Sequence, residues 1–339
     1  MAAENQHYVP KFILRQFILN PEKEQVRVYD KLKNTEFTTS VKNIMAERRF
    51  NEFVFEYHIA SFEQIAGAIE DRLLPAYRTV LKSELLDHTP EQQAALAFFI
   101  AFQFVRTKSH RDLWKQMTDA IAKKLEAMGG DIKDIAGYEE LTEDNLKKHH
   151  LLTLRQTVAE FAPIIAAKNF LLMRAPKGRS FYLGDNPVVM HNAEEHGFYG
   201  NIGLAVRGIE IYLPLSSKLV LCALCPSIAA KLRSEWESSQ KVGQLDLIRA
   251  ASAGKITISD VMKIRDQMRP VNDHAELLIK KFEEGGTIDG KEDQVDFINS
   301  LQTMHASRFV ICKKGDLSLA KRHNAEFPKF RSGIRLSMG

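Results

Sequence analysis

The spacing of apolar residues changes near the middle of the chain, and this change limits the folds that the chain can adopt. From residue 58 to about residue 84, apolar side chains recur every three or four positions, the period of an amphipathic helix: Ile59, Phe62, Ala66, Ile69 and Leu73. After about residue 167, short β-rich segments separated by Gly, Pro or Asn follow one another, which is typical of antiparallel strands. We therefore predict an α+β fold, with a helical N-terminal half packed on a mostly antiparallel sheet that the C-terminal half forms.

Turn and cap signals divide the chain into elements. Expected helices cover residues 40–46, 58–84, 89–125, 142–167, 226–251, 258–281 and 293–307. Expected strands cover residues 26–29, 36–39, 170–174, 180–183, 188–190, 209–213, 219–224 and 308–312. The first two strands are expected to form a hairpin around Lys33-Asn34.

A polar stretch after Met128-Gly129-Gly130 is a natural boundary. With 339 residues, the chain is long enough for two packed units or one large unit. We expect an N-terminal region of hairpin and helices over residues 1–128, a region of helices and antiparallel sheet over 129–312, and a basic tail over 313–339. The alternative is one continuous globular unit.

Basic residues gather at the C-terminal end. The formal net charge of the whole chain is +4. Between residues 313 and 339, seven basic residues stand against two acids, Asp316 and Glu326, so this stretch alone carries +5: Lys313, Lys314, Lys321, Arg322, Lys329, Arg331 and Arg335. A basic tail of this kind can bind the phosphate backbone of RNA or DNA. The alternative is a solvated terminus without a partner.

Neither secretion nor membrane insertion is indicated. Residues 1–6 are polar and lack the apolar segment of a signal peptide, and the longest apolar run, residues 94–105, is shorter than the roughly 20 residues of a membrane span. Three cysteines fit a reducing compartment. Cys222 and Cys225 should face opposite sides of a strand, which favours ordinary buried thiols over a metal or redox pair. We therefore expect a cytoplasmic protein that does not contact a membrane.

A dense polar and aromatic block lies at the N-terminus. Residues 5–10 read Asn-Gln-His-Tyr-Val-Pro, and Arg15 follows shortly after. Pro10 fixes its own φ angle and keeps Val9 extended. An amide pair, an imidazole, a phenol and a guanidinium within a dozen residues indicate a site, with His7 as the catalytic candidate and Arg15 as a binding candidate. The alternative is that His7 and Arg15 fix the N-terminus to the sheet.

The long helix predicted over residues 89–125 carries polar groups on its apolar side. Phe99, Gln103, Arg106 and His110 share one face, and Arg111 lies beside them. Because a buried Gln or Arg is costly without a partner, an acidic or anionic group must face them. Gln103, Arg106 and Arg111 are therefore binding candidates.

Two glutamates of the preceding helix are natural partners for Arg106. Glu63 and Glu70 lie two turns apart and flank its apolar face. One interpretation is an internal ion pair between helices; the other is that Arg106 binds a phosphate or carboxylate, since a guanidinium suits an oxyanion. Paired acids of this kind can also hold Mg²⁺ through oxygen ligands.

The sequence Gly184-Asp185-Asn186-Pro187 separates two expected strands. It fits a tight hairpin turn, and it equally fits a strand end that presents Asp185 and Asn186 as metal-binding or proton-handling groups. Two further polar residues are binding candidates, although structural roles are favoured for both: Ser216 after a strand, and Asn299 on the last long helix.

The order of these motifs resembles that of an uncharacterised, mainly bacterial family whose members open with the His-Tyr-Val-Pro block. Relatives also carry a Ser-Asp-Asn-Pro turn before a Val-Val strand, an Arg-Thr on a middle helix, a Pro-Leu-Ser after a strand, and an Asn about seven residues before an Ala. The corresponding residues here are Asp185-Asn186-Pro187, Arg106-Thr107, Pro214-Leu215-Ser216, and Asn299 with Ala306. Gly184 replaces the Ser of the relatives, which removes a hydroxyl from the turn. The resemblance implies candidate positions and does not imply a reaction.

Our first functional hypothesis is a phosphodiester hydrolase, an RNA or DNA nuclease of a host-defence or toxin-like kind. His7 would move protons, because an imidazole titrates near neutrality. Glu63 and Asp185 would hold Mg²⁺ or orient water, with Asn186 beside them, and Arg106 would stabilise charge on the phosphoryl oxygens. The defence role is inferred only from the scattered bacterial character of such families.

The second hypothesis is a non-enzymatic module that binds an anionic small molecule or a protein partner through the same residues. A third is that all of these residues are structural. The first two hypotheses require His7, Arg106 and Asp185 to meet at one cavity.

Overall fold

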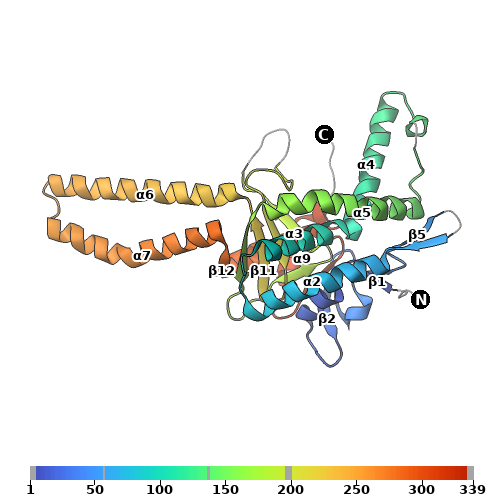
Figure 1. The fold of residues 1–339 in the computed structure, drawn as a ribbon, viewed down its shortest axis with the longest axis horizontal. Helices are drawn as coiled ribbons and strands as arrows, with labels where there is room; N and C mark the ends of the chain where they lie inside the picture. Colours follow the sequence, from blue (N-terminus) through green and yellow to red (C-terminus); the bar gives the residue numbers. More distant parts are fainter. Residues whose placement is uncertain (1–4, 56–57, 136–137, 195–200, 334–339) are drawn as a thin grey trace.

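The computed structural model describes residues 5–55, 58–135, 138–194 and 201–333. Figure 1 shows a mixed body of helices and sheets, from which one long helical hairpin projects. This hairpin consists of α6 (Pro226–Ser252) and α7 (Ile258–Glu284). None of the helices within the described ranges combines the length and the apolar character that a membrane span requires.

Strands and helices both occur along the whole chain. The strands are β1 (Asn5–His7), β2 (Gln25–Asp30), β3 (Thr35–Ser40), β4 (Ala46–Arg48), β5 (Glu52–Phe55), β6 (His58–Ser61), β7 (Asn169–Arg174), β8 (Tyr182–Gly184), β9 (Val189–His191), β10 (Glu210–Pro214), β11 (Leu219–Leu224), β12 (Gly286–Asp289) and β13 (Phe309–Cys312). The other α-helices are α1 (Lys11–Leu14), α2 (Glu63–Ser83), α3 (Pro90–Val105), α4 (Lys108–Ala127), α5 (Glu143–Ala166), α8 (Glu292–His305) and α9 (Ser318–Glu326). Short 3-10 helices are η1 (Arg15–Phe17), η2 (Val41–Asn43), η3 (Ile132–Asp134) and η5 (Pro328–Phe330).

Two larger sheets form the body. One has the strand order β12-β7-β11-β10-β9, and all of its neighbours are antiparallel except β12 and β7, which are parallel. The other has the order β3-β2-β13-β8 and is antiparallel throughout. Two small pairs, β1 with β4 and β5 with β6, complete the described strands. The connection from β8 to β9 therefore takes the chain from one large sheet to the other.

Both faces of the five-stranded sheet are covered. Along β11, Leu221 and Ala223 belong to the main core, which also contains buried residues of α2, α3 and α5. The alternate residues Val220 and Cys222 pack in a second cluster with α8. Because successive side chains of a strand point to opposite faces, a strand covered on both faces must be apolar throughout, and all six residues of β11 are buried.

The predicted fold class is wrong. The described residues up to Ser61 contain six strands, and the two longest helices described, α6 and α7, lie in the second half of the chain. The four-stranded sheet joins β2 and β3 from the N-terminal region to β8 and β13 from the C-terminal region. The fold is therefore mixed α/β with several sheets, and it is not a helical half packed on a sheet made by the other half. The periodicity of a segment reports its local structure, but not the distant strand with which it pairs.

Local structure agrees with the prediction at the first hairpin and differs from it in two of the predicted helices. The hairpin over residues 26–29 and 36–39 is confirmed by the β2–β3 pairing. The helix over residues 89–125 is two helices, because α3 ends at Val105 and the Thr107 side chain caps α4 by accepting from the His110 N–H. Residues 58–61 form strand β6, whereas we predicted the start of a helix.

The predicted basic tail is folded where the structure describes it. It forms α9 and η5, and its Lys321 makes an ion pair with Glu36. The Arg331 guanidinium donates to the carbonyl oxygen of Lys31 at 3.1 Å. Arg335 lies outside the described residues. Part of the basic charge therefore stabilises the contact between this segment and the N-terminal region.

Candidate functional site

The N-terminal block is fixed by hydrogen bonds to the main chain. Strand β1 pairs with β4, and the Gln6 side chain accepts from the Asn51 N–H at 2.6 Å and donates to Glu52 at 2.8 Å. The buried His7 ring places Nε2 2.9 Å from the carbonyl oxygen of Val41, so this nitrogen carries the proton and donates it. Burial lowers the pKa of His7 to about 4, and the ring is neutral near pH 7.

The polar side chains of α3 bind this same block. Gln103 donates to the carbonyl oxygen of Tyr8 at 3.0 Å, and Arg106 donates to that of His7 at 2.7 Å. The second arm of the Arg106 guanidinium forms an ion pair with Glu70 at 2.6 Å. Of the two interpretations of Arg106, the geometry therefore matches the internal ion pair, in which Glu70 is the acidic partner.

The other predicted acid of α2 has a different neighbour. Glu63 accepts from the Asn51 side-chain amide at 2.6 Å. Arg15 forms a half-exposed ion pair with Glu24 at 2.7 Å. Neither Glu63 nor Arg15 lines the cavity that Asp185 lines, so the predicted binding and catalytic residues are not all brought together there.

Arg111 is enclosed near the start of α4. Its guanidinium lies 3.7 Å from the centroid of the Phe50 ring and donates to the carbonyl oxygen of Phe50 at 2.7 Å. Its Nε donates to Nδ1 of His150 at 3.3 Å, and Nε2 of His150 in turn donates to the carbonyl oxygen of Val105 at 2.7 Å. The guanidinium of Arg111 therefore has its contacts within the protein.

The carboxylate of Asp185 is occupied by backbone donors. It accepts from the N–H groups of Ser307, Arg308 and Phe309 at 2.8, 2.9 and 3.0 Å. Burial raises its pKa to about 6, while these N–H donors and Lys31 favour the ionised form. The Asn186 side chain accepts from the Thr107 hydroxyl at 3.3 Å.

Two further candidates also have structural contacts. The Ser216 hydroxyl accepts from the N–H groups of Lys218 and Leu219, both at 3.1 Å, which closes the β10–β11 turn. Asn299 of α8 accepts from the Tyr182 N–H at 2.7 Å and donates to the carbonyl oxygen of Ser180 at 3.0 Å.

A cavity of about 690 Å³ lies where the N-terminal block approaches the 184–187 turn. We call it the landmark cavity. Its walls come from β4, α4, the start of β13 and the residues that directly follow β1 and β8, and they include Tyr8, Glu47, Lys108, Asp112, Lys115, Asp185 and Arg308. Of the predicted catalytic residues, Asp185 lies on its wall, whereas His7, Glu63 and Asn186 do not.

A second hollow region lies at the opposite ends of β8 and β13. Two adjoining pockets of about 340 and 470 Å³ share Gly178, Arg179, Ser180 and Lys314. We call them together the basic groove. Seven cationic side chains line it against three carboxylates: Arg174, Lys177, Arg179, Lys218, Lys313, Lys314 and Arg322 against Glu84, Asp296 and Asp316.

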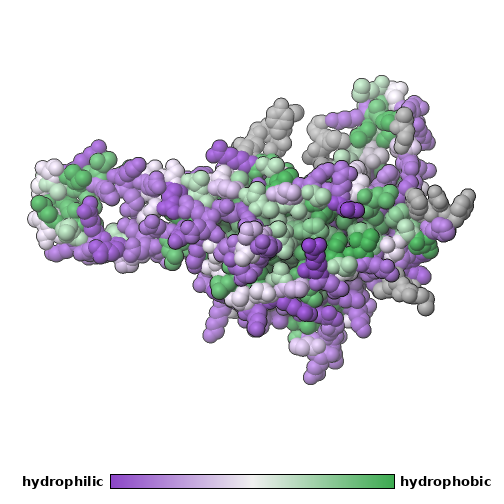
Figure 2. Space-filling model, in the orientation of Figure 1, coloured by the Kyte–Doolittle hydropathy of each residue, from purple (hydrophilic) through white to green (hydrophobic). Residues whose placement is uncertain are grey.

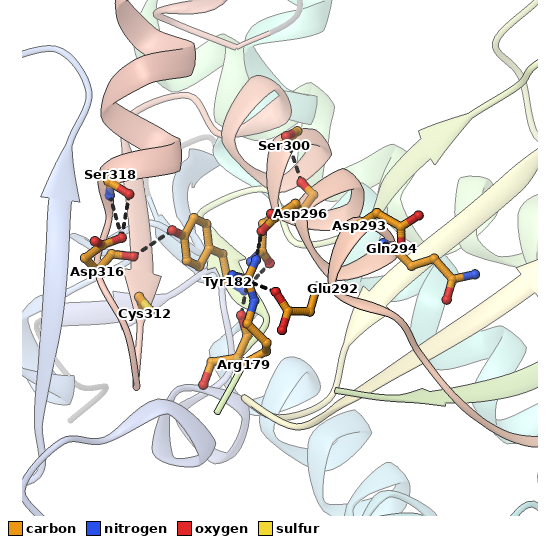
Figure 3. Close-up of polar contacts among 12 residues, drawn as sticks. Arg179, Tyr182, Glu292, Asp293, Gln294, Asp296, Ser300, Cys312, Asp316 and Ser318 are labelled. Carbon is orange, nitrogen blue, oxygen red and sulfur yellow. Dashed lines mark hydrogen bonds and ion pairs between the residues drawn. The ribbon is translucent and has the colours of Figure 1, made fainter. Parts of the chain in front are cut away.

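Figure 3 shows one side of the basic groove. Arg179 points to Glu292 and Asp296 of α8, with which it forms ion pairs, and the Tyr182 hydroxyl donates to the main chain of Asp316 at 2.7 Å. The Asp316 carboxylate accepts from Ser318 at the start of α9. These contacts fix the walls of the groove.

Only part of this groove could be predicted from the sequence. Lys313 and Lys314 belong to the basic stretch that we singled out, whereas Lys177 and Lys218 are isolated lysines in turns far from it along the chain. The fold brings them together because β13 and the β10–β11 turn end on the same side of the body as the β7–β8 connection.

The residues predicted to bind Mg²⁺ do not form a metal site. Glu63 and Asp185 lie in different surroundings, and the carboxylate of Asp185 is engaged by three N–H donors. In the ranges that the structure describes, no group of three or more His, Cys, Asp or Glu side chains is arranged to hold a metal ion. We therefore derive no metal-dependent step.

Comparison with known proteins gives a family and no function. A family model described as a protein of unknown function, DUF4238, matches residues 5–316. No curated protein and no solved structure matches the chain.

Proposed function

Because the chain belongs to the DUF4238 family of proteins of unknown function, we propose a function from its own geometry: it binds the phosphate backbone of RNA or DNA along the basic groove. This proposal keeps the substrate class of the first hypothesis. It moves the binding surface from the predicted tail as a whole to the groove that Lys313 and Lys314 line together with residues of three other segments.

The observation that carries the proposal is a cluster of lysines without acidic partners. Lys218, Lys313 and Lys314 form no ion pair with any carboxylate in the described ranges. Burial lowers the pKa of Lys313, and the positive charges of Lys314 and Lys218 lower it further. Bringing like charges together costs free energy, and a bound anion would remove that cost.

The extent of the groove favours a polymer over a single phosphate group. Five of its cations have no carboxylate partner among the described residues: Lys177, Lys218, Lys313, Lys314 and Arg322. They come from the β7–β8 connection, the β10–β11 turn, the β13–α9 connection and α9. A nucleic-acid backbone presents a regular row of negative charges that can contact several such cations at once.

Cleavage of the bound polymer and a role in host defence stay predictions. The residues first expected to carry catalysis make the internal contacts described above, so the groove supports binding and leaves the chemistry to be measured. A cytoplasmic location is part of the proposal, since Cys222, Cys225 and Cys312 are free and buried and RNA and DNA are available there.

Fluorescence anisotropy with labelled single-stranded RNA and duplex DNA tests the proposal. We expect Lys313→Glu/Lys314→Glu to weaken binding by about tenfold or more, and to reduce the slope of log K against log salt by between one and two. The matched control is Lys255→Glu/Lys263→Glu, which makes the same charge change at exposed positions of the α6–α7 hairpin. Gel analysis of the same mixtures reports cleavage.

Two results would contradict the proposal. One is that the unaltered protein binds neither nucleic acid in a salt-dependent way. The other is that the groove variant and the hairpin variant weaken binding equally, which would indicate a response to net charge and not to the groove. Equal thermal melting of all three proteins controls for folding.

A further inference from the structure

Tyr8 presents a hydroxyl without a partner at the wall of the landmark cavity. The residue is 4% exposed, and its ring packs on Phe50 with the centroids 5.3 Å apart. Its main chain is fixed by hydrogen bonds to Met45 and Gln103 at 3.1 and 3.0 Å. No residue that the structure describes forms a hydrogen bond with the hydroxyl. A buried hydroxyl that is held rigidly and faces a hollow is available to a ligand.

The charges that act on this hydroxyl are mainly negative. Burial raises the pKa of Tyr8, and the carboxylates of Asp185, Glu47 and Asp112 add to this rise, whereas Arg308 opposes it. Three acids from three different elements therefore lie around one phenol group. Such a field favours a positive charge in the cavity.

Four carboxylates line the cavity, Glu47, Asp112, Asp119 and Asp185, against three cations, Lys108, Lys115 and Arg308, so its wall carries a net negative charge. Lys108 forms an ion pair with Glu47, and Arg308 donates twice to Asp30 at 2.9 and 3.0 Å. Asp112 makes no ion pair or hydrogen bond with the described residues, and burial raises its pKa. The Asp112 carboxylate therefore has no direct contact with a cation, although the charges of Lys108, Arg111 and Lys115 act on it from a distance.

Part of the wall is apolar. Met45, Leu32 and Phe309 line the same cavity as Tyr8 and Asp112. An alkyl chain would gain free energy by burial against these side chains. A bare metal ion is a poorer fit, because the ranges that the structure covers contain no cluster of three ligating side chains.

We propose that the landmark cavity binds a small alkylamine, with its ammonium group between the Tyr8 hydroxyl and the Asp112 carboxylate and its alkyl chain against Met45 and Phe309. An ammonium group has three N–H donors and no acceptor, which matches a phenol oxygen and a carboxylate. This site is separate from the basic groove, since β8 and β13 run between the two. It therefore does not depend on the proposed binding of nucleic acid.

Isothermal titration calorimetry with putrescine tests this proposal on the full chain without nucleic acid. The neutral control ligand is 1,4-butanediol, which has the same chain length and hydroxyl groups in place of the amines. We expect saturable binding of putrescine and none of butanediol, together with a higher melting temperature in putrescine.

Two variants identify the contacts. Tyr8→Phe and Asp112→Asn should each weaken putrescine binding by about tenfold or more, because each removes one contact to a charged group. Both should melt like the unaltered protein, since the groups removed have no partner in the described structure. Asp71→Asn, at an exposed position of α2, should bind putrescine normally.

The proposal is wrong if putrescine gives no binding heat, or if butanediol binds as tightly. It is equally wrong if both Tyr8→Phe and Asp112→Asn leave the affinity unchanged. A loss of affinity in Asp71→Asn equal to that in Asp112→Asn would also overturn it, because the response would then report overall charge.

Discussion

Asp185 joins the ends of two strands that lie far apart along the chain. It follows β8, and its carboxylate accepts from three consecutive N–H groups that lead into β13. Its own N–H donates to the carbonyl oxygen of Phe309 at 3.0 Å. At this point the chain also leaves the four-stranded sheet for the five-stranded one. One buried side chain therefore holds the junction of the two sheets.

Asp185→Asn should destabilise the protein. The amide group would direct N–H donors at backbone N–H groups that now donate to a carboxylate oxygen, leaving buried donors without acceptors. We expect the free energy of unfolding to fall by about 2–4 kcal/mol. Urea denaturation at about pH 7.5 measures this, because the carboxylate is then ionised. The matched control is Asp112→Asn, which should change stability by less than about 0.5 kcal/mol. Similar losses in the two variants would show that the three hydrogen bonds are not responsible.

Four predicted site residues share one kind of partner. His7, Gln103, Arg106 and Asp185 each bind main-chain atoms of a distant segment. From the sequence we could predict that Gln103 and Arg106 are buried and must be satisfied, since they lie on the apolar side of a helix. We could not predict whether a ligand or the backbone satisfies them, because that depends on which segment the fold places opposite each side chain.

Elements are predicted well where the signal is local. The Thr89 hydroxyl caps α3, and Pro90 occupies its first position, as the Thr-Pro sequence indicates. The break between α3 and α4 was missed because the apolar pattern continues across it. In the sequence, nothing distinguishes Thr107 from an ordinary helical residue. Its role as a cap is shown only by the structure, in which the backbone turns at this point.

The folding of the α6–α7 hairpin depends little on the body, and the folding of the body depends little on the hairpin. Each helix has 27 residues, or a length of about 40 Å, and each has one buried residue, Ala229 in α6 and Ile279 in α7, close to the body. Figure 2 shows apolar side chains at the outer end of the hairpin, where Ile248 and Ile258 are 57% and 80% exposed.

Replacing residues 238–273 by a short Gly-Ser loop should leave the body folded. No residue in this segment is buried, so little apolar contact is lost. We expect the melting temperature to change by less than about 2 °C, and binding to RNA to stay the same. The matched control is Ile279→Ala at the base of the hairpin, which should lower stability by about 2–4 kcal/mol. Loss of cooperative melting in the shortened protein would show that the hairpin is part of the folding unit.

At the scale of the whole molecule, the two ends of the chain meet in one sheet. Strand β13 pairs with β2 on one side and with β8 on the other. The buried Lys31 donates to the carbonyl oxygens of Thr303 at 2.6 Å and of Phe330 at 2.8 Å. Such pairings cannot be predicted from periodicity, because several apolar segments fit each place in a sheet equally well. This is the physical reason why the predicted fold class failed although many of its elements exist.

Buried histidines distributed over this body make stability depend on pH. His7, His150 and His305 are each less than a tenth exposed. Burial lowers their pKa values to about 4, 3 and 4. Burial lowers the pKa of His110 to about 4 as well. Below about pH 6.5 the unfolded chain therefore takes up four protons that the folded chain refuses, so acid favours unfolding. Stability is therefore complete above about pH 6.5 and is lost as the pH falls toward 4.

The slope of stability against pH tests this. Four histidines give up to about 5 kcal/mol per pH unit, and Asp185 offsets about 1.4 kcal/mol of this below pH 6, because its raised pKa has the opposite effect. His7→Gln keeps a donor for the carbonyl oxygen of Val41 and cannot titrate, so urea denaturation between about pH 7 and 5 should give a slope lower by about 1.4 kcal/mol per pH unit. His274→Gln, at an exposed position of α7, should keep the original slope. If both variants keep that slope, His7 takes up its proton in the folded protein, and its ring cannot be held neutral by burial.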